Sequence, residues 1–518
     1  MRKYDVNTLN EQEFDTLLQD GIPALPPDDI VHDVTPWRKA IHRILIGFAL
    51  GTITLNFAAL NYLLPTIGII LTILGFRTLQ KENRWFRVCW ILTLIRSTWF
   101  FSAFILNTTV YQDAFFHSAL ASVLNVLNVL ICLLLYICFW RALLTVKEKA
   151  GLDPHAGGAA ALIGWNAFVC AFGLLQVPGD LIMGILLLIA YVCIIRSLVK
   201  LSKELDEAGY CISVAPVRLT DRIIVLALTL LLLTGCACGY IFFRQYPMDW
   251  QPASQTETDE TKEVREHLVS LGFPEHILDD LTQEDLLSCK GALRVVVDVN
   301  DHPVNNGRQV MEVQAGIIHY STVFDQKELR ITGIAVELPG QQEQWRIIHH
   351  FQWVIDPGFH GTDVIQLWTA YKNGMGWLSG SEVTGQVLYN DGAQIYAAPY
   401  FSLGPETYTT NTIFWGAQTS SNIFAAFSMP NQGEKHRGYV SYTIKEAQAG
   451  WIIDAWINFT HQKTWLQYPA LTAKQKILTS GISSSNTFIT IQDALQYYPS
   501  DADSDLPNGG SSKLQKNN

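Results

Sequence analysis

The chain has 518 residues, of which 49% are apolar and only 16% are charged, and its formal net charge is −11. This composition is too apolar for one soluble domain and indicates a membrane domain plus at least one globular domain. Residues 245–518 hold 17 Lys and Arg against 30 Asp and Glu, so they carry the negative charge. An acidic C-terminal half argues against nucleic acid as a partner.

Residues 1–40 are polar and are expected to form a cytoplasmic leader without a cleavable signal peptide. Trp37, Arg38 and Lys39 come just before the first apolar tract. Aromatic and cationic residues in this position are typical of the cytoplasmic surface of a membrane. The first membrane crossing is therefore expected to act as its own insertion signal.

Seven transmembrane helices are predicted within residues 41–244. Each segment is close to the length needed to cross a hydrocarbon core about 30 Å thick. The apolar tract 44–76 is divided into two short crossings because Asn56, Asn61 and Pro65 interrupt it. The predicted crossings span approximately residues 41–59, 62–78, 86–107, 117–140, 158–176, 181–199 and 223–243.

The distribution of basic residues predicts the orientation of these helices. The loops assigned to one side carry Lys and Arg, whereas the loops near residue 60, at 108–116 and at 177–180 carry none. Basic loops stay in the cytoplasm, so the N-terminus is expected inside the plasma membrane and the C-terminal domain outside. If the first two crossings were one tilted helix, this rule would fail at every later loop.

The exported part of the chain is predicted to be mainly β. Residues 245–262 form a polar linker, and residues 263–292 form a small helical module in which Thr282–Asp285 is a helix-capping sequence. Apolar residues then alternate with polar ones over residues 293–498, between turn clusters, which indicates an antiparallel, sandwich-like β domain. Residues 499–518 are expected to be a disordered tail.

Arg96 is the strongest candidate for a functional residue in the membrane. It lies near the middle of the third predicted crossing, and no Asp or Glu lies inside any crossing. A charge at this depth needs a partner. Asn125, Asn128 and Asn166 occur at similar depth. Either this polar cluster binds an anionic group or lipid headgroup in a cavity, or Arg96 bonds to the amides and locks the helices together.

The exported domain is rich in tryptophan, which can fill a β core or stack on a ligand. Most of these rings are expected in the core. Trp377 and Trp415 lie beside glycines in expected loops, so they are the candidates for exposed aromatic binding.

No metal site and no cofactor are expected from the sequence. The adjacent His349 and His350 point to opposite faces of a strand, and no cysteine lies near these or near His360, His436 and His461. The sequence lacks the phosphate-binding loop, the G-x-S-x-G elbow and H-E-x-x-H. These absences argue against enzymatic activity without excluding it.

Residues 35–87, which begin TPWRKAIHRILIGFALG, resemble the start of uncharacterised multi-pass membrane proteins of anaerobic Gram-positive bacteria. Residues 271–292, LGFPEHILDDLTQEDLLSCKGA, resemble the segment that opens the exported domain of those proteins. This resemblance implies a bacterial membrane protein with an exported C-terminal domain. It implies no site residue.

The sequence favours a non-enzymatic integral membrane protein that anchors an extracytoplasmic β domain, which binds an extracellular ligand or protein partner. The alternative is a small-solute transporter or permease subunit with a polar path at Arg96. A membrane-bound hydrolase is a third hypothesis. A cavity reaching Arg96 would favour the transporter, and a cleft on the β domain would favour the binding protein.

Overall fold

The computed structural model describes residues 36–52, 60–175, 181–210, 212–213, 219–253, 258–314, 317–368, 377–379, 382–412, 416–446, 452–480 and 486–497. Most of the expected leader and the whole expected tail lie outside these residues. The chain forms two compact units. The first comprises residues up to 105 together with 114–234, and the second comprises 106–113 together with 235 onward.

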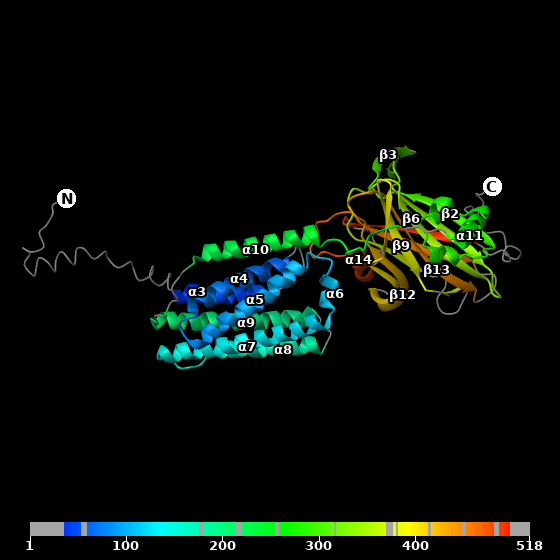
Figure 1. Cartoon of the computed structure of the whole chain (residues 1–518). Helices are drawn as coiled ribbons and strands as arrows, with labels where there is room; N and C mark the ends of the chain where they lie inside the picture. The colour runs from blue at the N-terminus through cyan, green and yellow to red at the C-terminus, as the bar shows by residue number, and fades with distance from the viewer. Residues whose placement is uncertain are drawn as a thin grey trace, which may run out of the picture. The chain divides into compact units, whose positions relative to one another are not determined.

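The apolar half of the chain is helical, and its long helices run side by side (Figure 1). Five of them, α4, α5, α7, α9 and α10, are long and apolar enough to cross a membrane, while α8 is a shorter apolar helix. The predicted count of seven crossings stays a prediction. The helices are α3 (Pro36–Thr52), α4 (Leu60–Leu79), α5 (Arg84–Leu106), α6 (Gln112–Phe116), α7 (Ala119–Lys149), α8 (Gly157–Leu174), α9 (Leu181–Glu207) and α10 (Asp221–Phe242).

The outward faces of the long helices are apolar. A contiguous apolar surface of this size is unfavourable in water and suits the hydrocarbon core of a bilayer, which makes the chain a multi-pass membrane protein. The exposed side chains on α7, α9 and α10 include Leu120, Val123, Val126, Leu130, Ile182, Ile185, Ile189, Leu226, Leu230 and Leu233.

Helices α3 and α4 pack with their backbones nearly in contact. A Cβ atom on Gly47 would lie 2.6 Å from the carbonyl oxygen of Gly68, and a Cβ on Gly68 would lie 2.7 Å from that of Gly47. Small residues permit this approach between membrane helices. The tract predicted to form two short crossings contains two helices, α3 and α4, and residues 53–59 between them lie outside the described part.

Charged residues join several helix ends of the first unit at one end of the bundle. Asp221, at the start of α10, pairs with Arg43 in α3 at 2.8 Å and with Arg77 at the end of α4 at 3.4 Å. Glu82, between α4 and α5, pairs with Lys149 at the end of α7 at 2.9 Å. Helices α3 and α4 are therefore antiparallel, and the helix ends rich in Lys and Arg share one side.

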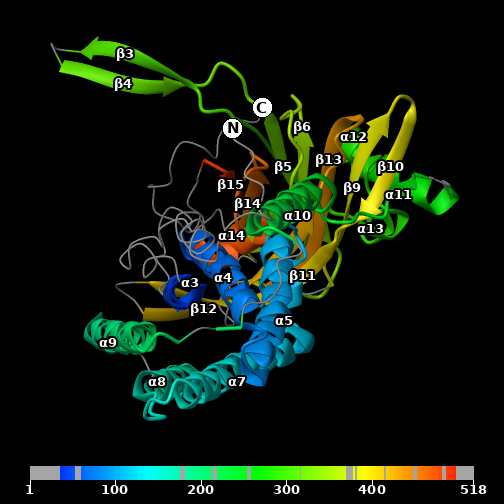
Figure 2. The ribbon, with the colours of Figure 1, turned by 90° about the vertical axis from the view of Figure 1, so that its left-hand side faces the viewer.

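The second unit contains two antiparallel sheets and a separate hairpin, as predicted for this half of the chain. The larger sheet has the order β1-β10-β9-β13-β6-β5-β2 with β8 beside β13, and the smaller has the order β11-β12-β7-β14-β15. Strands β3 and β4 extend away from both sheets as a hairpin (Figure 2). The strands are β1 (Gln251–Pro252), β2 (Arg294–His302), β3 (Arg308–Gln314), β4 (Ile317–Val323), β5 (Leu329–Leu338), β6 (Gln344–Trp353), β7 (Asp363–Trp368), β8 (Trp377–Ser379), β9 (Thr384–Asp391), β10 (Gln394–Pro399), β11 (Ser402–Thr412), β12 (Gly416–Phe427), β13 (Glu434–Glu446), β14 (Ile453–Gln462) and β15 (Phe488–Tyr497).

The alternation of side chains gives the larger sheet two buried faces. On β5, Ile331 and Ala335 join the core that both sheets share, whereas Ile334 and Val336 face a second apolar cluster. The helical module α11 (Asp259–Ser270), α12 (Glu275–Leu278) and α13 (Gln283–Leu287) supplies the rest of that cluster. On the smaller sheet, α14 (Ala473–Ser480) covers the face away from the shared core.

Part of the segment expected to be a linker is structured. Gln251–Pro252 pairs with β10 as an edge strand. Thr258 caps α11, whose first residue is Asp259. The predicted cap at Thr282 is also present, because its hydroxyl accepts a hydrogen bond from the Asp285 N–H.

Two buried carboxylates fasten the helical module to the larger sheet. Asp280 accepts hydrogen bonds from the Arg437 guanidinium and lies 3.0 Å from His350 Nε2. Asp285 lies 2.6 Å from Arg346 Nη2 and accepts a hydrogen bond from the Tyr439 hydroxyl. Both acidic side chains are only 2% exposed, so these pairs replace the water that the charges would otherwise need.

The short segment 106–113, which follows α5, belongs to the second unit. The Ala470 N–H donates to the carbonyl of Asn107 at 2.7 Å. The Val110 N–H donates to the carbonyl of Phe243 at 2.9 Å, and Val110 joins the apolar cluster beneath α14. The loop after the third predicted crossing is thus part of the β unit.

Candidate functional sites

The helical unit encloses a cavity of about 320 Å³ at Arg96. Four helices contribute to its wall: α3, α4, α5 and α7. The volume falls at the lower end of the range for small-molecule sites. Both apolar and polar side chains line it, and the polar lining residues are Thr52, Asn61, Thr72, Thr93, Arg96, Ser97, Asn128 and Tyr136.

Arg96 is the charged residue in this wall. It lies twelve residues after the start of α5, which is about 18 Å along the helix. Arg96 forms a side-chain hydrogen bond with Tyr136, and Cys132 and Tyr191 also interact with it electrostatically. Within the described residues no carboxylate forms an ion pair with Arg96. Among the described residues, the cavity therefore presents a cation that has no carboxylate as its partner.

The structure brings together two of the four residues predicted for the membrane cluster. Arg96 and Asn128 both line the cavity, and Asn128 Oδ1 is buried without a hydrogen-bond partner among the described residues. Asn125 is exposed on the surface of α7, and Asn166 on α8 lies outside the cavity wall. Asn125 and Asn166 therefore do not share the cavity wall with Arg96.

The two tryptophans predicted for exposed binding cannot be assigned that role from the described residues. Trp377 begins β8, at the edge that pairs with β13, but its side chain is not among the described ones. Trp415 lies outside the described residues. Trp345 and Trp353 are buried in the shared core, as expected for most of the rings.

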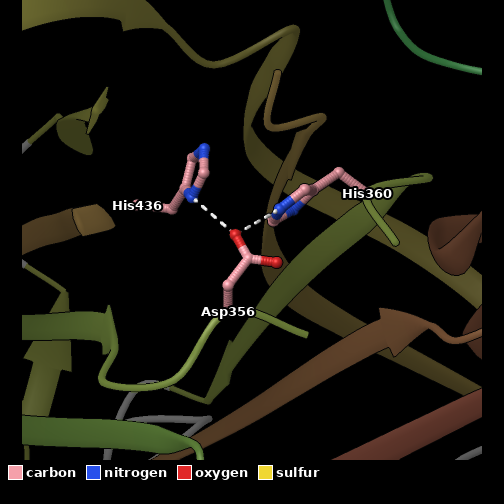
Figure 3. Close-up of side chains that lie close together, drawn as sticks. All are labelled: Asp356, His360 and His436. Atoms are coloured by element: carbon pink, nitrogen blue, oxygen red, sulfur yellow. Dashed lines mark hydrogen bonds and ion pairs between the residues drawn. The ribbon is translucent and has the colours of Figure 1, made fainter. Parts of the chain in front are cut away.

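A second candidate site, missed in the sequence, lies in the β unit. Figure 3 shows the carboxylate of Asp356 pointing between the rings of His360 and His436. Asp356 Oδ2 lies 3.1 Å from His360 Nε2 and 3.5 Å from His436 Nδ1. The two imidazoles are buried, whereas the Asp356 side chain is 51% exposed. One atom from each residue could therefore hold a metal ion.

The surroundings of this cluster shift the pKa values of two of its members. Burial alone would raise the pKa of Asp356, but the Gly358 N–H and the two histidines outweigh it and lower that pKa. Burial lowers the pKa of His436, and His360 lowers it further, against the opposing effect of Asp356 and nearby backbone carbonyls. The ordinary state at neutral pH is thus a carboxylate beside a neutral His436.

Sequence reasoning had little signal for this cluster. Asp356 stands in an Asp-Pro-Gly sequence that indicates a turn, and His360 and His436 are 76 positions apart. His360 follows Asp356 by four residues, and that spacing was the one local hint. The pairing of β13 with β6 is what carries His436 into the same place.

No protein-family model and no curated protein matches the sequence. Among solved structures, the chain is similar to the one described as "AvmM Catalyzes Macrocyclization in Alchivemycin A Biosynthesis", at 12% identity over 40% of this chain and 99% of that chain, with a TM-score of 0.15. At that TM-score the likeness carries no argument about fold or function. The resemblance of residues 35–87 and 271–292 to bacterial membrane proteins stays a resemblance.

Proposed function

We propose that this chain is an integral plasma-membrane protein that binds a small anionic ligand in the Arg96 cavity and carries its β unit outside the cytoplasm. The observation that carries this proposal is an arginine in the wall of a cavity of the helical unit, with a hydrogen bond to Tyr136 but no carboxylate partner among the described residues. A buried cation without a counter-charge is costly, and an anion entering the cavity would remove that cost. This favours the transporter or permease hypothesis over a purely structural role for Arg96.

The residues that line the cavity suggest the class of ligand. Arg96 offers a planar set of donors that suits a carboxylate or phosphate group. Ile69, Phe100 and Leu135 line the same space and suit an apolar part of the ligand. The ligand would therefore be a carboxylate or phosphate with an apolar portion, either a free solute or a lipid.

The contacts of segment 106–113 support the proposed topology. This segment hydrogen-bonds residues of the β unit, so the end of α5 and the end of α10 belong on the same side of the membrane. The chain must then cross an even number of times between them. Helices α7, α9 and α10 account for three crossings, so α8 would be the fourth despite its shorter length.

The charges at the other helix ends support the orientation. The end of the bundle that holds Arg43, Arg77 and Lys149 is the basic one. Basic ends remain in the cytoplasm, which would place the β unit outside.

The topology predicts an asymmetric response to protease. We expect protease added to intact cells that express the full chain to digest the β unit and to spare a tag at the N-terminus, because the two ends lie in different compartments. Immunoblots for the tag and for a β-unit epitope measure this. The tag must become sensitive after the cells are permeabilised. Protection of both ends, or cleavage of both, would contradict the topology.

Replacing Arg96 by Leu tests the proposed ligand site. The full chain in phosphatidylcholine nanodiscs is titrated with oleate and with inorganic phosphate, and anionic lipid is tested by adding phosphatidylglycerol to the discs. We expect at least one probe to bind the wild type and to bind R96L about 10- to 100-fold more weakly, because a charge-assisted hydrogen bond contributes roughly 1.5–3 kcal/mol. Calorimetry or native mass spectrometry measures the binding.

Arg87→Leu is the matched control, because Arg87 lies on the same helix but is exposed and outside the cavity wall. R87L should bind as the wild type does. Equal binding by R96L and the wild type would refute the site. If the wild type binds no probe and R96L fails to insert into the membrane, the ligand site is refuted. Arg96 would then serve helix packing instead.

A further inference from the structure

The loop after β6 holds Asp356 in one orientation. The Gly358 N–H donates to Asp356 Oδ1 at 2.6 Å, and Gly358 has φ of +75°, which favours glycine. One carboxylate oxygen is thereby occupied by the turn, and Oδ2 is left to face the two imidazoles (Figure 3). Such a hydrogen bond to the second oxygen is how ligating carboxylates are commonly positioned.

His436 is aimed at the same point by an irregularity in β13. The pairing of β13 with β9 shifts register between Glu434 and Arg437, and Lys435 has φ of 53°. A β-bulge of this kind redirects a side chain and is frequent beside functional sites. Gln245 connects the loop between β6 and β7 with the loop between β12 and β13. Its side-chain amide donates hydrogen bonds to the carbonyls of His360 and Met429.

The hydrogen-bond partners of His436 leave a lone pair facing the carboxylate. Its Nε2 lies 3.3 Å from the carbonyl oxygen of Gln432, which can only accept, so Nε2 carries the hydrogen. In the neutral ring Nδ1 is then an acceptor, and it points at Asp356 Oδ2 from 3.5 Å. Two acceptors at this distance repel each other unless a proton or a metal ion lies between them.

Two of the separations lie close to those between the ligand atoms of one metal ion. Zn²⁺ bonds of about 2.0–2.2 Å at a tetrahedral angle place two ligand atoms about 3.3–3.6 Å apart. The two measured separations from Asp356 Oδ2 are 3.1 and 3.5 Å, and all three candidate ligand atoms lie within 4.8 Å of one another. Binding would therefore need side-chain adjustments of about 1 Å or less.

We propose that Asp356 Oδ2, His360 Nε2 and His436 Nδ1 bind one divalent transition-metal ion of the Zn²⁺ type. Two imidazoles with one carboxylate favour such an ion over Ca²⁺ or Mg²⁺, which prefer oxygen ligands. The imidazoles are 3% and 2% exposed while Asp356 is 51% exposed, so the ion lies at the edge of the domain. Three protein ligands leave at least one coordination position for water or a ligand's donor atom.

Metal binding by the full chain in detergent tests this site. The chelator-treated protein is titrated with Zn²⁺ by calorimetry and with Co²⁺ by visible absorption, which reports the coordination of the ion. We expect one ion per wild-type chain. Asp356→Asn should weaken binding by more than about 100-fold, since loss of a supporting residue alone commonly costs 10- to 100-fold. D356N keeps the oxygen that accepts from Gly358, so folding should be preserved.

His436→Asn is the second variant and should lose the ion in the same way. His302→Asn is the matched control, because His302 forms a simple histidine–carboxylate pair with Asp493 at 3.1 Å in the same unit. H302N should bind the ion as the wild type does. If the wild type binds no Zn²⁺ or Co²⁺, or if D356N and H436N bind as tightly as the wild type, the cluster is a hydrogen-bonded group only and the proposal fails.

Discussion

Replacing Asp280 by Asn should lower the free energy of unfolding of the β unit by about 3–5 kcal/mol, because it breaks a buried ion pair by removing one partner. The Arg437 Nε atom lies 2.8 and 2.9 Å from the two carboxylate oxygens, and His350 Nε2 lies 3.0 Å from one of them. In D280N the buried guanidinium keeps its charge and loses its counter-charge. Urea unfolding of the full chain, followed by tryptophan fluorescence, measures the difference.

The neighbouring Asp279 provides the matched control. Its side chain is 56% exposed and pairs with Arg265 at the surface, so Asp279→Asn should change stability by no more than about 0.5 kcal/mol. The double variant D280N/R437Q removes both charges and should regain part of the loss. Equal stabilities of D280N and D279N would show that the buried pair does not hold the helical module on the sheet.

His349 should make the β unit less stable as the pH falls below about 6.5. Its side chain is 1% exposed, and burial lowers its pKa from 6.5 to about 4. The unfolded chain takes up a proton below pH 6.5, whereas the folded chain does so only near pH 4. Stability is therefore complete above pH 6.5 and is lost as the pH falls, by about 3 kcal/mol in all.

His349→Leu isolates this effect. Both ring nitrogens of His349 lack hydrogen-bond partners among the described residues, so an apolar side chain should cost little at pH 7. The stability of H349L relative to the wild type should then rise steadily between pH 6.5 and 4.5 in urea unfolding. Asp280, whose pKa is lowered below its usual value by His350 and Arg437 against the effect of burial, acts at lower pH. Parallel curves for the two proteins would contradict the assignment.

Local patterns were enough to predict which half of the chain lies in the membrane and which half forms β-sheets. The predicted last crossing, residues 223–243, corresponds to α10, because a long uncharged run can satisfy its backbone in lipid only as a helix. Period-two alternation likewise predicted strands such as β6 and β14. These features depend on near neighbours in the chain. The count of seven crossings stays a prediction, because α3 has only 17 residues and α8 is a shorter apolar helix.

The sites required the tertiary structure. Asn125 and Asn128 lie one turn apart on α7, yet only Asn128 reaches the Arg96 cavity, because the packing of neighbouring helices decides which side of α7 faces inward. His436 meets Asp356 and His360 only through strand pairing and a β-bulge. Residue type and spacing thus predicted which segments are membrane-length apolar helices and which form the β unit. Contacts between residues far apart in sequence decided which polar groups share a cavity, and those contacts depend on register and helix rotation, which no local pattern encodes.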